Sequence, residues 1–262
     1  MDTPLLWHIP ISHFNEKARW ALDYKRIAHH RQVLGPDYLI RAWRATGRGT
    51  LPILFLDGRA IGDSTRIIAA LEERYPEPPL YPGNADARQR ALALEDYFDE
   101  QLGPAVRAAI VTPLFRHDPD VALRVLTTGM PDKAYQTLRP LRRIFPSYYR
   151  FRHKIRDAKL EADRVTVNAA LERIEHERQG RAYLVTDAFT VADLTAAALL
   201  GPLLQPPEIQ YPLGAELPVY LQKYRTALLQ HPGMQWAAGI YRLHRGRSAA
   251  VSRRPAANVT SP

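Results

Sequence analysis

Polar side chains that can do chemistry stand at the starts of two helices in the N-terminal part of the sequence. Ser12 lies where an apolar strand gives way to a helical pattern, and Asp63-Ser64 opens a second helix. Pro52 begins a strand in the same stretch, TLPILFLDGRAIGDSTRII. Helix starts favour negative charge, because free amides and the helix dipole are found there. Serine and aspartate are also ordinary helix caps, so a structural role stays open.

The chain contains no cysteine, and this absence restricts its chemistry strongly. It excludes disulfides, thiolate metal sites, iron–sulfur clusters and a cysteine nucleophile. The nine histidines show no ligand spacing such as HExxH, and the adjacent His29 and His30 would point in different directions on a helix or strand. We therefore expect no metal site.

A formal net charge of +9 favours anionic partners, which include nucleic acid, a membrane surface or a small acidic ligand. Much of the excess lies between Arg139 and Arg156, where Tyr148, Tyr149 and Phe151 interleave with the basic residues. Single-strand binders combine the same residue types, but no nucleic-acid motif accompanies them here. We interpret the cluster as a solvated helix face and do not expect nucleic acid as a partner.

The composition predicts a globular, cytoplasmic protein. The chain has 262 residues, of which 46% are hydrophobic, so it can bury a sizeable core. It has no apolar run of about 18 residues, the length that a membrane span requires. The first residues also lack the layout of a signal peptide.

The elements that position these residues alternate between strand and helix up to a proline-rich linker. The pattern predicts strands near 5–9, 27–33, 53–56 and 59–61, and helices over 12–24, 37–43 and 64–74. This order predicts a mixed sheet covered by helices. The prolines at 76, 78, 79 and 82 cannot continue a helix, so they mark the linker.

Beyond the linker the pattern predicts helices alone. We expect helices over 86–115, with a kink near Gly103-Pro104, and over 154–178, 218–230 and 233–243. An irregular insertion, interrupted by prolines, occupies about 117–150. Thr190 and Asp193 form a capping box before a nearly continuous apolar run, which predicts a central, buried helix.

Together these features resemble the cytosolic glutathione transferase superfamily, with the serine-type or cysteine-type N-terminal motif of bacterial members. The marks are the helix that starts at Ser12, the pairs Leu51-Pro52 and Asp63-Ser64, and the capping box, in that order. The resemblance implies an α/β thioredoxin-like N-terminal domain and an all-α C-terminal helical domain. The implied boundaries are 1–76 for the thiol-binding domain, 77–83 for the linker, 84–244 for the helical domain and 245–262 for a disordered basic tail.

The resemblance also implies a site for glutathione or another low-molecular-weight thiol. Pro52 corresponds to the family's cis-proline, which exposes the backbone of Leu51 to a peptide ligand. Asp63 and Ser64 correspond to the pair that receives the γ-glutamyl end. Ser12 corresponds to the position that contacts the sulfur, where a hydroxyl donor favours the thiolate. The alternatives are a trans-proline at an edge strand and plain helix caps.

Asn15 departs from the family pattern. Close relatives of this helix often carry cysteine there or at Ser12, so the chemistry of a cysteine-dependent thiol transferase, dehydroascorbate reductase or reductive dehalogenase is excluded. The Asn15 amide can itself donate to the sulfur, which makes it a rival of Ser12. Arg48 and Thr50, just before the cis-proline, are expected near the glycine carboxylate of the thiol.

The resemblance further implies a hydrophobic electrophile as second substrate. We expect its site between the domains, lined by Phe14, Tyr97, Val111 and the segment 117–149. Arg19 or the start of the first helix would supply a positive field. A homodimer is also implied, and Asp96 or Asp99 would reach across it.

Three functions follow from this. The first is a detoxifying glutathione transferase. The second is a non-catalytic module that binds partners through its Arg-rich insertion and tail, and the third is a thiol-dependent isomerase. The joint presence of Ser12, Pro52 and Ser64 favours an enzyme, because a scaffold has no need of all three.

Overall fold

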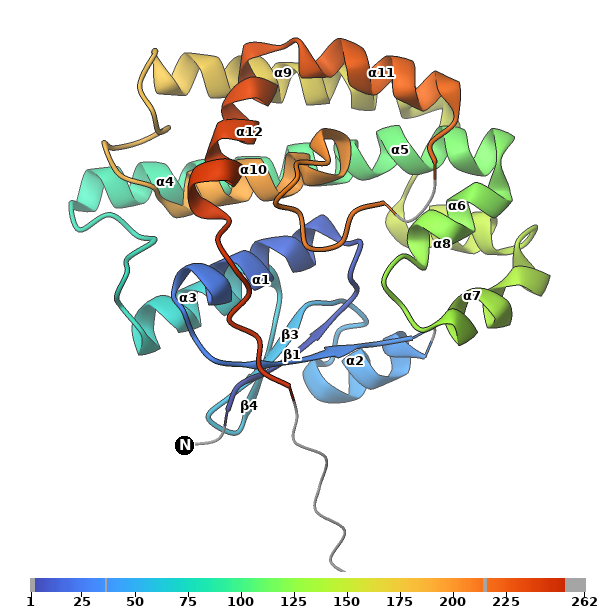
Figure 1. Ribbon diagram of the computed structural model, residues 1–262, viewed down its shortest axis with the longest axis horizontal. Coiled ribbons are helices and arrows are strands. Elements are labelled where there is room, and N and C mark those ends of the chain that lie inside the picture. Colours follow the sequence, from blue (N-terminus) through green and yellow to red (C-terminus); the bar gives the residue numbers. More distant parts are fainter. Residues whose placement is uncertain (1–2, 36, 214–215, 253–262) are drawn as a thin grey trace, which may run out of the picture.

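A four-stranded mixed sheet forms the base of the N-terminal domain (Figure 1). The computed structural model describes residues 3–35, 37–213 and 216–252. The strands are β1 (Leu5–His8), β2 (His30–Val33), β3 (Ile53–Leu56) and β4 (Arg59–Gly62), in the order β2-β1-β3-β4. β1 runs parallel to β2 and antiparallel to β3, and β4 is antiparallel to β3. The mixed sheet that the sequence predicts is confirmed.

Three helices complete this domain: α1 (His13–Tyr24), α2 (Tyr38–Thr46) and α3 (Ser64–Arg74). α1 and α3 pack together between the sheet and the helical domain (Figure 1). Trp20 and Leu22 of α1 and Ile67 of α3 are fully buried. α1 is therefore covered on both sides, and it joins the two domains into one core.

The helical domain follows after residues 75–84. Its main helices are α4 (Ala85–Tyr97), α5 (Gly103–His117), α9 (Leu160–Arg178), α10 (Val191–Leu204), α11 (Val219–Leu229) and α12 (Pro232–His244). A π-helical segment, Phe98–Leu102, joins α4 to α5 close to the predicted kink. The described parts of the chain contain no helix that is long and apolar enough to cross a membrane.

α10 is the central helix of the molecule, as the sequence predicts. All its residues are buried, and it packs against α1, α4 and α12. Its capping box is present, with the Asp193 carboxylate accepting hydrogen bonds from the amides of Thr190 and Leu184, both at 2.8 Å. Burial raises the pKa of Asp193 to about 6, and these amide donors limit the rise.

The insertion is helical, whereas the sequence suggests an irregular segment. It contains α6 (Pro119–Leu126), α7 (Asp132–Leu138), a 3₁₀ turn (Arg139–Leu141) and α8 (Phe145–His153). Pro119 and Pro146 stand in the first turns of α6 and α8, where a missing amide proton costs nothing. These prolines therefore start helices and do not interrupt them. In Figure 1 the insertion lies beside the sheet domain, below the end of α5.

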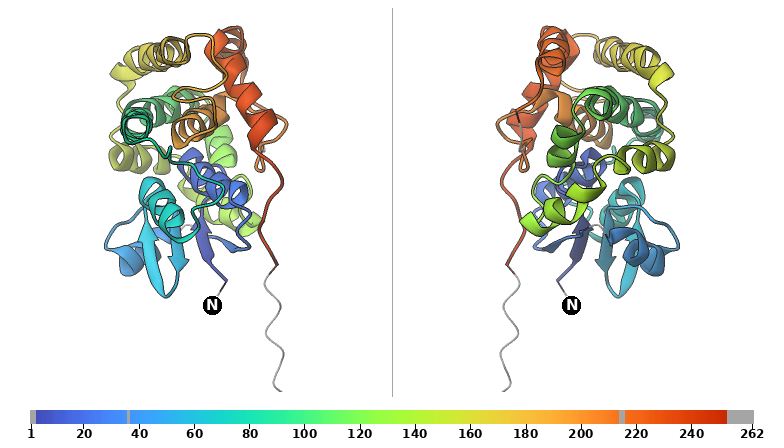
Figure 2. Two further views of the ribbon diagram at one scale, coloured as in Figure 1. Left: turned by 90° about the vertical axis from the view of Figure 1, so that its left-hand side faces the viewer. Right: turned by 90° about the vertical axis from the view of Figure 1, so that its right-hand side faces the viewer.

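The C-terminal segment 245–252 runs back along the sheet domain, on the side opposite β4 (Figure 2). The Val251 amide donates to the His29 carbonyl at 2.8 Å, and Ala250 forms a parallel bridge with His29. Arg245 is fully buried and pairs with Glu16 and Asp23 of α1. The sequence suggests a disordered tail from 245 onward, but its first part is docked by these contacts, and 253–262 lie outside the described residues.

Candidate functional site

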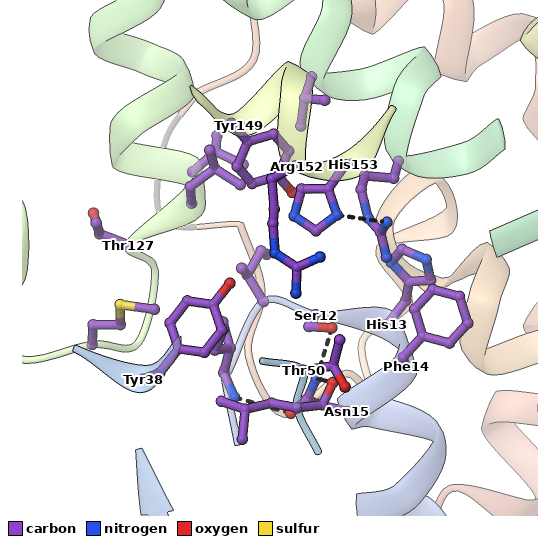
Figure 3. A pocket seen from close by; sticks show the side chains of 18 of the residues that line it. Ser12, His13, Phe14, Asn15, Tyr38, Thr50, Thr127, Tyr149, Arg152 and His153 are labelled. Atoms are coloured by element: carbon purple, nitrogen blue, oxygen red, sulfur yellow. Dashed lines mark hydrogen bonds between the residues drawn. The ribbon is translucent and has the colours of Figure 1, made fainter. Parts of the chain in front are cut away.

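A cavity of about 650 Å³ lies between the two domains (Figure 3). We call its N-terminal side the floor and its helical side the roof. The floor comprises the loop after β1, residues 49–52 and the start of α3. The roof comprises α5 and the insertion, and most of its lining is apolar. A concave, mostly apolar site with a few polar groups suits a small organic ligand.

Ser12 and Asn15 meet on the floor. Ser12 precedes α1, but its side chain does not cap the helix. Instead the Asn15 side-chain amide donates to Ser12 Oγ at 2.8 Å and to the Leu51 carbonyl at 3.2 Å. Asn15 Oδ1 accepts from the Ile9 amide at 3.1 Å. One buried asparagine thus ties the loop after β1 to the segment before Pro52.

These partners fix the orientation of the Asn15 amide. The Ile9 amide can only donate and the Leu51 carbonyl can only accept, so Oδ1 must face the first and Nδ2 the second. Ser12 Oγ therefore accepts a hydrogen bond from Asn15, and its own hydroxyl proton stays available to a ligand. Of the two candidates for the sulfur contact, Ser12 has a free hydroxyl proton, whereas both amide protons of Asn15 are already donated within the protein.

The Leu51–Pro52 bond is cis, as predicted. Both residues line the cavity, and the Pro52 carbonyl accepts from the Asp63 amide at 3.3 Å. Among the described residues, nothing in the protein accepts a hydrogen bond from the Leu51 amide. The floor therefore offers one free backbone donor next to Ser12.

Asp63 and Ser64 also lie on the floor, at the start of α3. Asp63 has a φ of 80°, an uncommon value for a residue other than glycine. Its carboxylate caps α3 through the amides of Thr65 and Arg66, at 3.0 and 3.4 Å. Ser64 is buried, and its own amide has no acceptor within the described part of the chain.

The two residues expected just before the cis-proline have different surroundings. Thr50 lines the cavity, but Arg48 is exposed and lies outside it. The cation beside this segment is Arg152 of α8, whose Nη2 donates to the Gly49 carbonyl at 2.7 Å. Figure 3 shows the Arg152 side chain extending from the roof toward Ser12 and Thr50.

The roof carries a second arginine and the neutral His153, and a second neutral histidine, His13 of α1, also lines the cavity. Arg107 of α5 donates to His153 Nδ1 at 3.1 Å and stacks over the Phe14 ring, 5.3 Å from its centroid. Burial and the nearby Arg107 lower the pKa of His153 and of His13 to about 3, so both rings stay uncharged. The positive charge of the roof therefore resides on its arginines.

Phe14 packs closely against α5 because Gly103 has no side chain there. A Cβ at that position would lie 2.5 Å from Phe14 Cζ. Phe14 and Val111 line the cavity as expected, together with several residues of the insertion. Tyr97 does not line it and instead lies beneath the Arg173 guanidinium.

Arg19 does not supply the positive field that the sequence suggests. It is buried outside the cavity, and its Nη2 pairs with Glu16 at 2.8 Å. Its charge is thereby compensated within α1. Asp99 is also engaged inside the chain, because it pairs with Lys17 and accepts from Thr65 Oγ1 at 2.7 Å.

The sheet domain and the helical domain each match a protein-family model. Residues 6–79 match the N-terminal domain of glutathione S-transferase, and residues 129–232 match its C-terminal domain. The chain belongs to the glutathione transferase superfamily. All the floor residues lie within the first match, whereas Arg152 and His153 lie within the second.

Solved structures of other glutathione transferase family members share the fold. The β-etherase LigF from Sphingobium sp. strain SYK-6 is 18% identical with a TM-score of 0.59, and the alignment covers 90% of this chain and 98% of that one. A glutathione S-transferase from Rhodospirillum rubrum F11 is 23% identical (TM-score 0.54; 90% and 91% covered). One from Methylobacillus flagellatus KT, with glutathione bound, is 19% identical (TM-score 0.54; 90% and 99% covered). A comparison with curated protein sequences gives no match.

Sequence reasoning missed Arg107, Arg152 and His153 as residues of the site. Arg152 and His153 belong to the basic, aromatic stretch that the sequence analysis interprets as a solvated helix face. A signal existed, because Arg152 and His153 follow Tyr149 by three and four residues, which places them on one side of a helix. Nothing local shows that this side turns toward the floor.

Proposed function

We propose that this transferase-family protein activates a small thiol, glutathione or an equivalent, for attack on a hydrophobic electrophile in the cavity. The observation that carries the proposal is the state of Ser12. Its oxygen already accepts a hydrogen bond from Asn15, so the group it presents to a ligand is its proton. A hydroxyl donor next to sulfur favours the thiolate and lowers the thiol pKa.

The reaction then needs no nucleophile from the protein. The thiol loses its proton to solvent, and the Ser12 hydroxyl stabilises the resulting thiolate. The sulfur lone pair forms a bond to the electrophilic carbon, and the leaving group departs with the electrons of the broken bond. The protein contributes orientation and a preorganised donor, which are the main sources of rate in such a site.

The floor has the donors that a peptide thiol requires. The free Leu51 amide lies directly before Pro52, where an extended peptide can pair with it. The free Ser64 amide at the start of α3 suits a carboxylate. The M. flagellatus relative with bound glutathione supports the choice of ligand.

The apolar roof supports an enzyme over a scaffold, because a module that binds only through its surface needs no cavity beside a free hydroxyl. A thiol-dependent isomerase would use the same thiolate, and the products distinguish it from a transferase. A homodimer belongs to the same proposal and is tested by sedimentation of the full chain.

The test is the pKa of the bound thiol, measured by the ultraviolet absorbance of the thiolate during a pH titration of the glutathione complex. We expect a pKa well below that of free glutathione, and its return toward the free value in Ser12→Ala. Conjugation to a chlorodinitrobenzene should fall by about 100-fold or more in the same variant, as when one preorganised donor is lost.

Ser147→Ala is the matched control, since Ser147 is exposed on α8 and does not line the cavity. A thiol pKa and turnover unchanged in Ser12→Ala would remove Ser12 from the mechanism. Failure of glutathione to bind at all would favour another thiol or the scaffold.

A further inference from the structure

The roof of the cavity holds two arginines without a carboxylate partner. Arg107 and Arg152 are half-buried and take part in none of the ion pairs found among the described residues. The fully buried Lys17, Arg19 and Arg245 each have a carboxylate partner. Each makes one hydrogen bond inside the protein, Arg107 to His153 and Arg152 to the Gly49 carbonyl. Most of the N–H donors of each guanidinium therefore remain free.

The surroundings of these arginines do not compensate their charge. Arg107 lowers the pKa of both His13 and His153 and limits the burial-induced rise in that of Tyr149, and no carboxylate acts on any of the three. Asp63, the acid that lines the cavity, lies on the floor and caps α3. The upper part of the cavity is thus positively charged, and most of the rest of its lining is apolar or aromatic.

An uncompensated guanidinium in an apolar pocket is stabilised by an anion from outside. Arg107 and Arg152 are half-buried, and partial removal of an unpaired charge from water is unfavourable. Arginine binds carboxylates through two parallel hydrogen bonds. Arg107 lies over the Phe14 ring, and the Tyr149 and His153 rings contact each other in a tilted arrangement with their centroids 4.3 Å apart. Aromatic surface and a free cation therefore occur together in the roof.

We propose that Arg107, assisted by Arg152, binds a carboxylate of the electrophile, so that the second substrate is an aromatic or unsaturated acid. The reaction of this acid rests on the proposed function, but its binding does not. A carboxylate can also come from the end of the thiol peptide, because Arg152 contacts Gly49 next to Thr50. Arg107 favours the electrophile as the source, since its contacts are with Phe14 and His153.

The experiment compares two uncleaved probes of equal shape, para-nitrobenzoate and para-nitrobenzamide, by calorimetry on the full chain without thiol. We expect the wild type to bind the benzoate about 10-fold more tightly or better, as a charge-assisted hydrogen bond predicts. Arg107→Gln should lose this preference, and Arg152→Gln should reduce it. Arg116→Gln is the control for α5, because Arg116 is exposed and lies outside the cavity.

A second arm separates the two sources of carboxylate. Glutathione and its glycine ethyl ester are titrated into the same variants, each first checked for native unfolding behaviour. If Arg107→Gln still binds glutathione more tightly than the ester, the glycine carboxylate does not bind to Arg107, and this supports the electrophile as the ligand of Arg107. If Arg107→Gln loses the preference for glutathione over the ester but keeps the preference for the benzoate, the assignment is overturned, and Arg107 binds the glycine carboxylate of the thiol instead.

A third arm separates this inference from the proposed function. Turnover is compared for chloronitrobenzoate and chloronitrobenzamide with glutathione. Benzoate preference without any turnover would leave the anion site standing and remove the transferase proposal. Turnover of both compounds at equal kcat/KM, with equal binding of the uncleaved probes, would overturn the anion site and keep the transferase.

Discussion

The floor and the roof of the cavity differ in how their polar groups are satisfied. On the floor, one buried asparagine serves three partners, and Asp63 caps the helix beside it. In the roof, two guanidinium groups have one hydrogen bond each and no carboxylate. The floor therefore offers a ligand two backbone amides and one hydroxyl proton that its own side chains hold in place, whereas the roof offers two cations without a carboxylate partner.

The charged residues of α1 also differ from the arginines of the roof, because they are paired within the chain. Glu16 and Asp23 of α1 are buried with Arg19, Arg31 and Arg245, and these charges are paired. Although burial raises the pKa of Glu16, Arg245 and Arg19 outweigh it and lower that pKa to about 2. The buried charges of this network are therefore compensated inside the chain, whereas the half-buried Arg107 and Arg152 at the cavity have no carboxylate partner among the described residues.

The largest effect should come from breaking the paired network. Glu16→Gln leaves the buried Arg19 without a carboxylate partner and Arg245 with Asp23 alone, so we expect a loss of about 3–5 kcal/mol in the free energy of unfolding. Urea denaturation measures it, with the surface pair variant Glu161→Gln as control, which should lose less than about 1 kcal/mol.

The same variant carries a pH signature. The lowered pKa of Glu16 stabilises the native state above its ordinary value of 4.5, and this stabilisation is lost as the pH falls toward about 2. The difference in the free energy of unfolding between wild type and Glu16→Gln should therefore become smaller as the pH falls from 4.5 to about 2. A constant difference would show that the network is not electrostatic in origin.

An intermediate effect is expected at the junction of the floor. In Asn15→Asp the new carboxylate cannot donate to Ser12 or to Leu51. The Ser12 hydroxyl would then donate its hydrogen bond to this carboxylate, and it would no longer donate to the sulfur. We expect a destabilisation of about 1–3 kcal/mol from the orphaned Leu51 carbonyl, and turnover as low as in Ser12→Ala. Thermal unfolding and the thiolate absorbance measure the two parts. Normal turnover with lowered stability would limit Asn15 to a structural role.

The smallest effect should come from the roof. His153 has its pKa lowered from 6.5 to about 3, so the unfolded chain takes up the proton first and wild-type stability falls as the pH drops below 6.5. His153→Gln lacks this contribution, and its unfolding temperature should decline less steeply between pH 6.5 and 3. His176→Gln, changed at an exposed position of α9, is the control. Equal slopes in the two variants would contradict burial of a neutral His153.

Much of the floor could be predicted because its signals are local. A proline after Leu51, an acid and a serine at the start of α3, and a serine at the end of β1 each act within a few residues of chain. The capping box at Thr190 and Asp193 is local in the same sense and is confirmed. The carboxylates of Asp63 and Asp193 accept hydrogen bonds from amides two or three residues away, so their placement follows from the local sequence.

The errors lie where long-range packing chooses between similar residues. Arg48 stands in the expected place along the chain but is exposed, and Arg152, about a hundred residues later, lies beside Gly49 instead. Arg19 pairs with Glu16 inside α1, and the same carboxylate also pairs with Arg245 from the segment that returns near the C-terminus. The residues next to a charged residue in the sequence do not show which other charged group lies beside it in the folded protein.

The sequence by itself determined the order of strands and helices, the turn at Leu51-Pro52 and the hydroxyl at the start of α1, because hydrophobic period and capping chemistry are read within one element. Only the tertiary structure decided that Asn15 orients Ser12, that the insertion folds into the roof, and that Arg107 and Arg152 face the cavity unpaired. These depend on which surfaces of distant elements pack together, and the free energy of that packing is shared among residues far apart in the chain.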